Sequence, residues 1–573
     1  MNRFFLVFVL SAVWLTPFAS AQKRIALTYD DAPRGDGRVF SGDQRAEVLI
    51  EALQSVEAGP AAFFVTTRGF ERTSGRDRVR KYADAEHLIA NHTHTHPWAN
   101  KTPSDAFLAE IDHAEAELSG LPNRRAWFRF PFLDEGRDAD KVQTIAAGLD
   151  ARGLANGYVT VDNYDWHVDL RLQQALRDEK WVDFEKLGRF YVRMMIYAAE
   201  YYDGIAVQTL GESPVHVLLL HENDLAALFA DDLVRAFRAA GWEIVSPDAA
   251  YDDPLPAPLS LNTGQGRVVG LAADAGRAAN TMWSWAIDEA MIDLQLERSG
   301  AFSDASERPG CSAPPQTPEI LAEGVISQQD RHEFGISLSQ DCEDLFVGIE
   351  HGDWQSVEHY RRTTTGWAHL RRVIGSENLS ANDPYITPDG QRLYYIRHEG
   401  ENTQIAYLDR EGVSSWSEPT ILPEPVNTAA REFYISFDTN GDLIFASDRD
   451  AEVEGDYNLY RASYDAGDFV SVAALPQGIN SRWYEADPFM APDSGYLLFA
   501  SNRRGGDGRG DIYVAFRLDG TSGSDPRPIT AINTSGHELC PFVSADGETL
   551  YYTSDQDIYR VSASFLQALK STP

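Results

Sequence analysis

The chain has 573 residues, of which 43% are hydrophobic and 24% are charged, and its formal net charge is −37. This length exceeds what one hydrophobic core supports, so two or three domains are expected. The acidic balance argues against binding to nucleic acids, which requires a basic surface, and against adhesion to anionic membranes. The charge fits either plain solubility or attraction to a cationic polymer, and both interpretations stay open.

The first 21 residues have the pattern of a signal peptide. Arg3 precedes a largely apolar run from Phe4 to Trp14, and Ala19-Ser20-Ala21 provides a small-residue cleavage site. The apolar run is short for a bilayer span, although an uncleaved anchor is the alternative. We therefore predict an exported protein, periplasmic or secreted, with no membrane span after removal of residues 1–21.

Strand-like and helix-like segments alternate over residues 22–253. Short β-rich runs are expected at 24–29, 61–66, 126–130, 157–161, 215–220 and 242–246, and helices at 44–55, 104–119 and 224–240. Such alternation predicts a parallel sheet or barrel, whose functional residues gather at the carboxyl ends of the strands.

Residues 254–320 are rich in proline and glycine and are predicted to form a connector with a helix over 280–297. From 321 to 573 the chain repeats itself with a period of roughly 50 residues, which indicates propeller blades. The repeats are clearest at Asp383-Pro384-Tyr385, Asp487-Pro488-Phe489 and Cys540-Pro541-Phe542. Five copies are visible, and a sixth could lie in 255–320 or be shared between the termini. We therefore expect an all-β propeller of five or six blades, and its repeats resemble those of TolB-type propellers.

The chain contains three cysteines, Cys311, Cys342 and Cys540. An exported protein can join two of them and leave one over. Cys311 and Cys342 are nearest in sequence and are the expected bridge, with three unpaired thiols as the alternative.

Two carboxylates stand side by side where the first strand ends, in Thr28-Tyr29-Asp30-Asp31-Ala32-Pro33. Adjacent side chains of an extended chain point in different directions. One carboxylate can therefore bind a metal while the other stays unligated and acts as a base. An Asp-Asp turn before Pro33 is the alternative.

Three histidines follow in His92-Thr93-His94-Thr95-His96. On a helical turn, His92 and His96 would present both rings on one face, as zinc-binding helices do. Together with Asp31 they would form a three-ligand site with a fourth position open for water, as catalytic zinc requires. A polar loop that happens to hold three histidines is the alternative.

Three further segments carry candidate residues. Arg129, in Arg129-Phe130-Pro131-Phe132, ends a buried strand and needs an anionic partner, either Asp30 or the substrate. In Asp162-Asn163-Tyr164-Asp165-Trp166, the Trp166 ring could form an apolar wall against a sugar. His221 ends Leu218-Leu219-Leu220-His221 and can act as an acid when a carboxylate is its partner. An ion pair, a polar turn and a core histidine are the respective structural alternatives.

Together, these five segments resemble the motifs of the polysaccharide deacetylase family, also called the NodB-homology or carbohydrate esterase 4 family, over about residues 23–251. The resemblance implies a distorted (β/α) barrel and a divalent metal, with Zn²⁺ expected. It implies the following roles: Asp30 as general base, His221 as general acid, Asp31, His92 and His96 as metal ligands, Arg129 orienting Asp30, and Asp162 tuning His221. Phe132 and Trp166 are the expected substrate-binding residues. The chain departs from the family pattern in having Ala32 in place of a glycine and an insertion-like stretch at 167–214.

The reaction implied by this resemblance is removal of N-acetyl groups from an acetylated polysaccharide or oligosaccharide. No residue distinguishes an amide from an ester, so removal of O-acetyl groups from a glycan such as acetylxylan is one alternative. A non-catalytic glycan-binding protein of the cell envelope is the other. The propeller could present a face to a protein or glycan partner.

Overall fold

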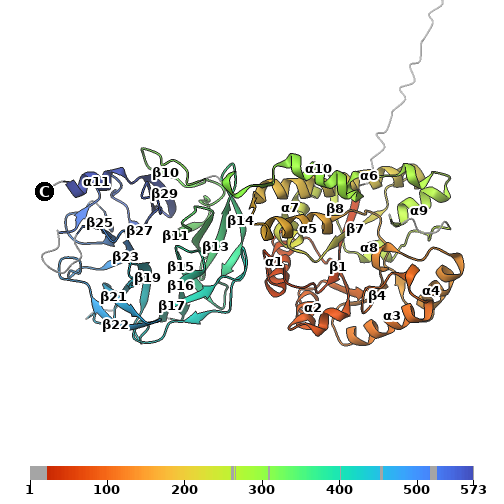
Figure 1. The fold of residues 1–573 in the computed structure, drawn as a ribbon, viewed down its shortest axis with the longest axis horizontal. Coiled ribbons are helices and arrows are strands. Elements are labelled where there is room, and N and C mark those ends of the chain that lie inside the picture. The colour runs from red at the N-terminus through yellow and green to blue at the C-terminus, as the bar shows by residue number, and fades with distance from the viewer. Residues whose placement is uncertain are drawn as a thin grey trace, which may run out of the picture.

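The structure is a computed structural model that describes residues 22–571, apart from 260–263, 265, 308–309, 401, 452–455, 507 and 517–524. The N-terminal part forms an α/β body and the C-terminal part an all-β body beside it (Figure 1). The predicted signal peptide lies outside the described residues. Within those residues, no helix has the length and apolar character that a membrane crossing needs.

A parallel sheet with the strand order β5-β4-β3-β2-β1-β7 forms the centre of the α/β body, and β8 pairs with the start of β1. The strands are β1 (Lys23–Ala32), β2 (Ala62–Val65), β3 (Leu88–Asn91), β4 (Arg124–Phe128), β5 (Ala155–Asn156), β7 (Val215–His221) and β8 (Trp242–Ile244). Val161, shortly after β5, bridges to Leu218 of β7, while β5 itself pairs with β4. The sheet therefore curls into a distorted barrel, as predicted.

The central strands are apolar because helices cover the outer face of the sheet. All four residues of β2 are buried, which matches its unbroken apolar run Ala-Phe-Phe-Val. The helices of this layer are α1 (Gly42–Ser55), α2 (Gly75–Asp84), α3 (Ser104–Leu118), α4 (Ala139–Ala151), α5 (Asp165–Arg177), α6 (Phe184–Leu210), α7 (Asp224–Ala239) and α8 (Asp248–Tyr251). Helix α1 begins with a capping box between Ser41 and Gln44, and α6 ends at Gly211 in the left-handed conformation.

Part of the predicted connector belongs to the α/β body. Helices α9 (Arg267–Asp274) and α10 (Glu289–Ser299) pack against α6, and β9 (Phe302–Ser303) pairs with β6 (Trp181–Val182). Apolar side chains of both helices, such as Val268 and Ile292, join the main hydrophobic core. The core of the α/β body therefore includes residues beyond 253, because the insertion-like stretch 167–214 supplies the surface on which α9 and α10 pack.

The C-terminal body is a propeller whose described residues form five four-stranded antiparallel sheets. The first four blades are β11 (His332–Leu338), β12 (Asp344–Glu350), β13 (Gln355–Arg362) and β14 (Trp367–Ile374); β15 (Ser380–Ile386), β16 (Arg392–Glu399), β17 (Asn402–Asp409) and β18 (Thr420–Ile421); β19 (Glu432–Phe437), β20 (Leu443–Ser447), β21 (Asn458–Asp465) and β22 (Asp468–Ala474); and β23 (Glu485–Met490), β24 (Leu497–Ser501), β25 (Asp511–Ala515) and β26 (Arg527–Pro528). The fifth combines β27 (Glu538–Val543), β28 (Thr549–Ser554) and β29 (Asp557–Ser562) with β10 (Glu319–Ile320), and the chain ends in α11 (Ser564–Ser571). Since β10 precedes the first blade and pairs with the last, the shared terminus completes a fifth blade and does not form a sixth.

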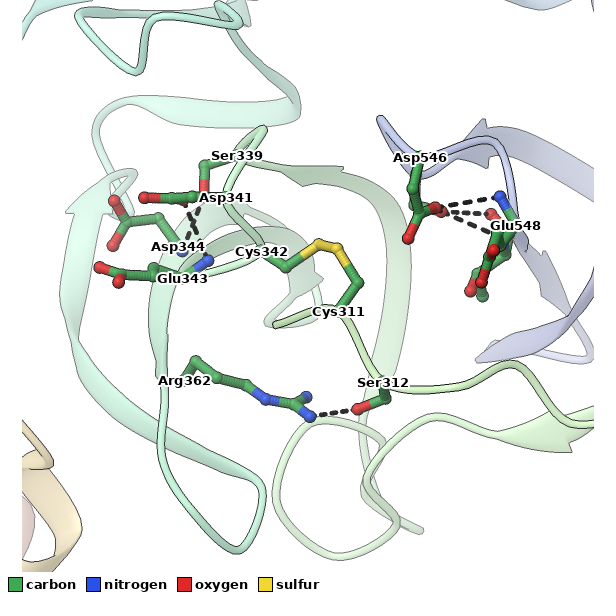
Figure 2. The surroundings of a disulfide bond; sticks show 12 residues. Cys311, Ser312, Ser339, Asp341, Cys342, Glu343, Asp344, Arg362, Asp546 and Glu548 are labelled. Atoms are coloured by element: carbon green, nitrogen blue, oxygen red, sulfur yellow. Dashed lines mark hydrogen bonds between the residues drawn. A yellow bond between two sulfur atoms is a disulfide. The ribbon is translucent and has the colours of Figure 1, made fainter. Parts of the chain in front are cut away.

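The expected disulfide between Cys311 and Cys342 is present, with the two Cα atoms 5.2 Å apart. It ties the segment that enters the propeller to the turn between β11 and β12, and Arg362 donates a hydrogen bond to Ser312 beside it (Figure 2). Cys540 is the free cysteine. The bridge thus holds the entry of the chain against the first blade.

Backbone hydrogen bonds join the two bodies. The N–H groups of Val413 and Ser414, in the propeller, donate to the carbonyl oxygens of Arg38 and Val39 at distances of 3.1 Å each. These bonds lie just before α1 and place the second blade beside that helix.

Candidate active site

The predicted site residues gather at the carboxyl ends of β1, β3, β4 and β7. Asp30 of β1 lies opposite His221 of β7 in the strand register. Asn91 of β3 pairs with Phe128 of β4, so the residues that follow, His92 and Arg129, emerge at the same edge. Carboxyl ends of parallel strands share one edge of a sheet, and this explains why motifs far apart in sequence meet here.

A bulge separates the two adjacent carboxylates. The register between β1 and β2 shifts between Asp30 and Ala32, and Asp31 has a φ of 67°. Asp30 is consequently buried, whereas Asp31 is partly exposed. Ala32 is fully buried in the core. The adjacent carboxylates thus have different surroundings, as expected from the sequence.

Asp31, His92 and His96 form a cluster whose ligand atoms all lie within 4.8 Å of one another. Asp31 Oδ1 is 3.7 Å from His92 Nε2 and 3.3 Å from His96 Nε2. His92 Nδ1 lies 2.9 Å from the carbonyl oxygen of Arg129, which can only accept, so Nδ1 carries the proton and Nε2 has a free lone pair. Burial lowers the pKa of both histidines to about 4, which favours the neutral, ligating form of the rings. The donor set of two imidazoles and one carboxylate fits a divalent metal such as zinc.

The two histidines do not lie on a helical turn, contrary to the sequence-based expectation. They belong to a loop after β3 in which Thr93 and His96 have φ angles of 70° and 61°. The loop is held by Thr67 N, which donates to Thr93 O, and by Glu110, which accepts from Thr95 N at 2.7 Å. Left-handed residues, and not helical periodicity, bring the two rings together.

Arg129 fixes one oxygen of Asp30. Its Nη1 donates to Asp30 Oδ1 at 2.6 Å, and its Nε and Nη2 donate to Gly157 O and Tyr251 Oη at 2.7 and 2.9 Å. Burial raises the pKa of Asp30, and the Arg129 guanidinium opposes that rise. Asp30 Oδ2 is 3.7 Å from His92 Nε2 and therefore faces the metal-ligand cluster. The predicted contact between Arg129 and Asp30 is present.

The carboxylate that contacts the His221 ring is that of Asp165, whereas the family resemblance implied Asp162 as the residue that tunes this histidine. Asp165 Oδ1 lies 2.6 Å from His221 Nδ1, and its Oδ2 accepts from His221 N at 2.8 Å and from Asn223 Nδ2 at 3.2 Å. Burial alone lowers the pKa of His221, but the Asp165 carboxylate outweighs it and raises that pKa to about 9. Asp165 reaches β7 because it is the first residue of α5. Asp162 is buried nearby, and burial raises its pKa to about 7.

Of the two predicted substrate-binding aromatics, Phe132 lies at the metal-ligand cluster. Its side chain is 45% exposed, stacks on Trp98 at 3.9 Å between ring centroids and meets the edge of the His96 ring at 4.5 Å. Trp166 instead contacts Tyr164 and His167 at 5.2 and 5.5 Å. Sequence reasoning missed Trp98, although its position two residues after His96 was a usable signal.

A buried charge network supports the loop that carries Asp31. Glu222 is fully buried, accepts from Arg34 N at 2.7 Å and lies 3.3 Å from Arg45 Nε. Arg34 Nη1 in turn approaches Asp31 Oδ2 at 3.9 Å. Sequence reasoning did not find these residues: Glu222 adjoins His221, but nothing in the pattern of α1 singles out Arg45.

Residues 19–151 match the family model described as "Polysaccharide deacetylase". Over 104 residues the chain is 36% identical to a chitooligosaccharide deacetylase from Rhizobium leguminosarum bv. trifolii, a match that covers 18% of this chain and 43% of that protein. The chain thus spans less than half the length of this curated relative. The family match includes Asp30, Asp31, His92, His96 and Arg129.

Two solved structures are each similar to part of the chain. A family 4 carbohydrate esterase from Streptomyces lividans, in complex with acetate, is 18% identical with a TM-score of 0.26, covering 39% of this chain and 94% of that one. A putative TolB from Agrobacterium tumefaciens is 19% identical with a TM-score of 0.29, covering 40% of this chain and 72% of that one.

Proposed function

From the polysaccharide deacetylase domain that this chain contains, we propose that the protein is an exported, metal-dependent hydrolase that removes N-acetyl groups from an amino-sugar polysaccharide or oligosaccharide. One observation carries the proposal: a carboxylate, Asp30, is held by an arginine beside a separate three-ligand cluster. A base and a metal site are thus available side by side. Export rests on the sequence of residues 1–21 alone.

The metal ligands are Asp31, His92 and His96, whose donor atoms suit a divalent ion with Zn²⁺ as the expected occupant. When bound, such an ion supplies Lewis-acid polarisation of the acetyl carbonyl and lowers the pKa of water.

Asp30 is the general base. Arg129 occupies its Oδ1, which leaves Oδ2 to accept a proton from the water whose oxygen attacks the acetyl carbon. The raised pKa of Asp30, which follows from its burial, makes this carboxylate a stronger proton acceptor than an exposed aspartate.

His221 is the general acid. Since Nδ1–H is bound to Asp165, the second ring nitrogen, Nε2, carries the proton that passes to the sugar nitrogen as the carbon–nitrogen bond breaks. Asp165 is the positioning residue that keeps His221 protonated near neutral pH. The products are acetate and a free amino sugar.

Phe132 contributes to substrate binding in two ways. Its exposed ring, stacked on Trp98 beside His96, offers an apolar face to a sugar ring. Its backbone N–H is the proposed donor to the oxyanion that develops on the acetyl group.

The proposal is tested by acetate release from N-acetylglucosamine oligomers and from acetylxylan by the purified mature protein. Measurements are made as purified, after treatment with a chelator, and after restoration of Zn²⁺. Release from the oligomers that the chelator stops and Zn²⁺ restores is the expected result. Release from acetylxylan alone would favour an O-acetyl esterase, and no release from either substrate would favour a glycan-binding protein. A partner at the propeller face stays a prediction.

A further inference from the structure

We propose a second binding site for a divalent transition metal, formed by His94, His113 and Glu117. The ligand atoms of these three side chains all lie within 4.8 Å of one another. His94 comes from the loop between the ligands His92 and His96, whereas His113 and Glu117 are one turn apart on α3. The deacetylase reaction proposed above uses a single metal, so this site lies beyond it.

The spacing of the three groups suits a shared ligand better than direct contacts. Glu117 Oε2 is 3.5 Å from His94 Nδ1, and Glu117 Oε1 is 3.5 Å from His113 Nε2. These distances are longer than a good nitrogen–oxygen hydrogen bond. Two ligand atoms at about 2.05 Å from a tetrahedral zinc ion are about 3.3 Å apart, close to each of these two contacts, in which Glu117 uses a different oxygen toward each histidine.

A buried oxygen points to a missing ligand in the same place. Glu117 Oε2 is shielded from solvent, and no described residue makes a hydrogen bond to it. A buried acceptor without a hydrogen-bond partner is unfavourable, and a bound cation would supply the missing partner. The Thr67 hydroxyl lies 3.0 Å from His94 Nδ1, and this hydrogen bond must break before that nitrogen binds a metal.

The site is closed on one side and open on the other. The side chain of His94 is 13% exposed, whereas that of His113 is 52% exposed. The two rings stack with their centroids 3.8 Å apart and 12° between their planes, so one ring must turn before the in-plane lone pairs of both nitrogens point at one ion. An ion can enter from the solvent beside His113, and water can complete its coordination.

A metal at this site would fasten α3 to the segment that carries the first metal ligands. Helix α3 already holds this segment, because Glu110 accepts from Thr95 N at 2.7 Å and Ile111 O accepts from Asn91 Nδ2 at 3.1 Å. A metal bound by His94 and by this helix would add an attachment at a point between His92 and His96.

The test is the stoichiometry of zinc binding by the full, metal-free chain, measured by titration against a chromophoric chelator. The wild type is expected to bind two equivalents and His113→Ala one. This substitution is mild because the side chain is half exposed and alanine favours a helix. His332→Ala is the matched control: its Nδ1 pairs with Glu350 at 3.3 Å, and the two residues belong to no three-ligand group among the described residues, so two equivalents are expected to remain.

The second site is rejected if wild type and His113→Ala bind the same number of equivalents. Asp31→Asn separates this proposal from the deacetylase proposal, since it removes a ligand only from the first cluster. A loss of one equivalent in His113→Ala, with none in Asp31→Asn, would support the second site and count against the first.

Discussion

Replacement of Asp165 by asparagine is expected to move the alkaline limit of activity to lower pH. The Asp165 carboxylate contacts His221 Nδ1 at 2.6 Å, and both side chains are largely buried. This contact raises the pKa of His221 from an ordinary 6.5 to about 9 against the opposing effect of burial. Asparagine has nearly the same shape but carries no charge, so it removes the effect that raises this pKa.

The size of the effect follows from the pKa of His221. A rise in the pKa of His221 from 6.5 to about 9 corresponds to about 3 kcal/mol in favour of the protonated ring. A raised pKa means that the protonated acid predominates below about 9 and is lost as the pH rises through that value. Near pH 7.5, nearly all of the wild-type His221 is protonated, whereas about a tenth is protonated at an ordinary pKa. We therefore expect at least a roughly tenfold loss of kcat/KM at this pH.

The assay is kcat/KM for acetate release from N-acetylglucosamine oligomers across the pH range. The wild type should lose activity with a midpoint near 9, and Asp165→Asn should do so below about 6.5. Asp293→Asn is the matched control. Asp293, on α10, lies with its Oδ1 2.8 Å from Nε2 of His167, a histidine that shares α5 with Asp165 but lies outside the site. An unchanged midpoint in Asp165→Asn would refute the role assigned to the His221–Asp165 pair.

Two further predictions concern stability. Arg129→Met leaves the buried Asp30 without its guanidinium partner and should lower the free energy of unfolding by about 3–5 kcal/mol, measured by denaturant titration. Arg125→Met, at a partly exposed ion pair, should cost at most about 1 kcal/mol, and equal losses in the two variants would contradict this reasoning. Reduction of the Cys311–Cys342 bridge, which closes a loop of sequence separation 31, should destabilise the propeller by about 4 kcal/mol. A thermal transition of the propeller that is the same with and without reductant would contradict this prediction.

The positions of most site residues could be predicted because each follows a strand of an alternating α/β pattern. Asp30 and His221 end apolar runs, and parallel strands bring such ends to one edge. The partner of His221 could not be predicted from the residues alone. Asp162 and Asp165 have the same chemistry within one five-residue segment, and the start of α5 decides which of them reaches β7.

Other features depend on interactions that a local pattern does not contain. A spacing of four between His92 and His96 suits a helix, yet left-handed loop residues produce the same convergence. The apolar residues of α9 and α10 indicate helices, but long-range packing on α6 decides which body they join. The number of blades depends on the pairing of β10 with β29, and β10 is a two-residue strand with no sequence signal of its own.

We propose that Asp30 and Asp31, adjacent in sequence, have separate roles as base and metal ligand. Acetate release and zinc binding by Asp30→Asn and Asp31→Asn test this division of roles. We expect Asp30→Asn to lose about a thousandfold in turnover but to bind as much zinc as the wild type. We expect Asp31→Asn to lose both activity and one equivalent of zinc. Full activity in Asp30→Asn, or equal loss of zinc in both variants, would contradict the claim.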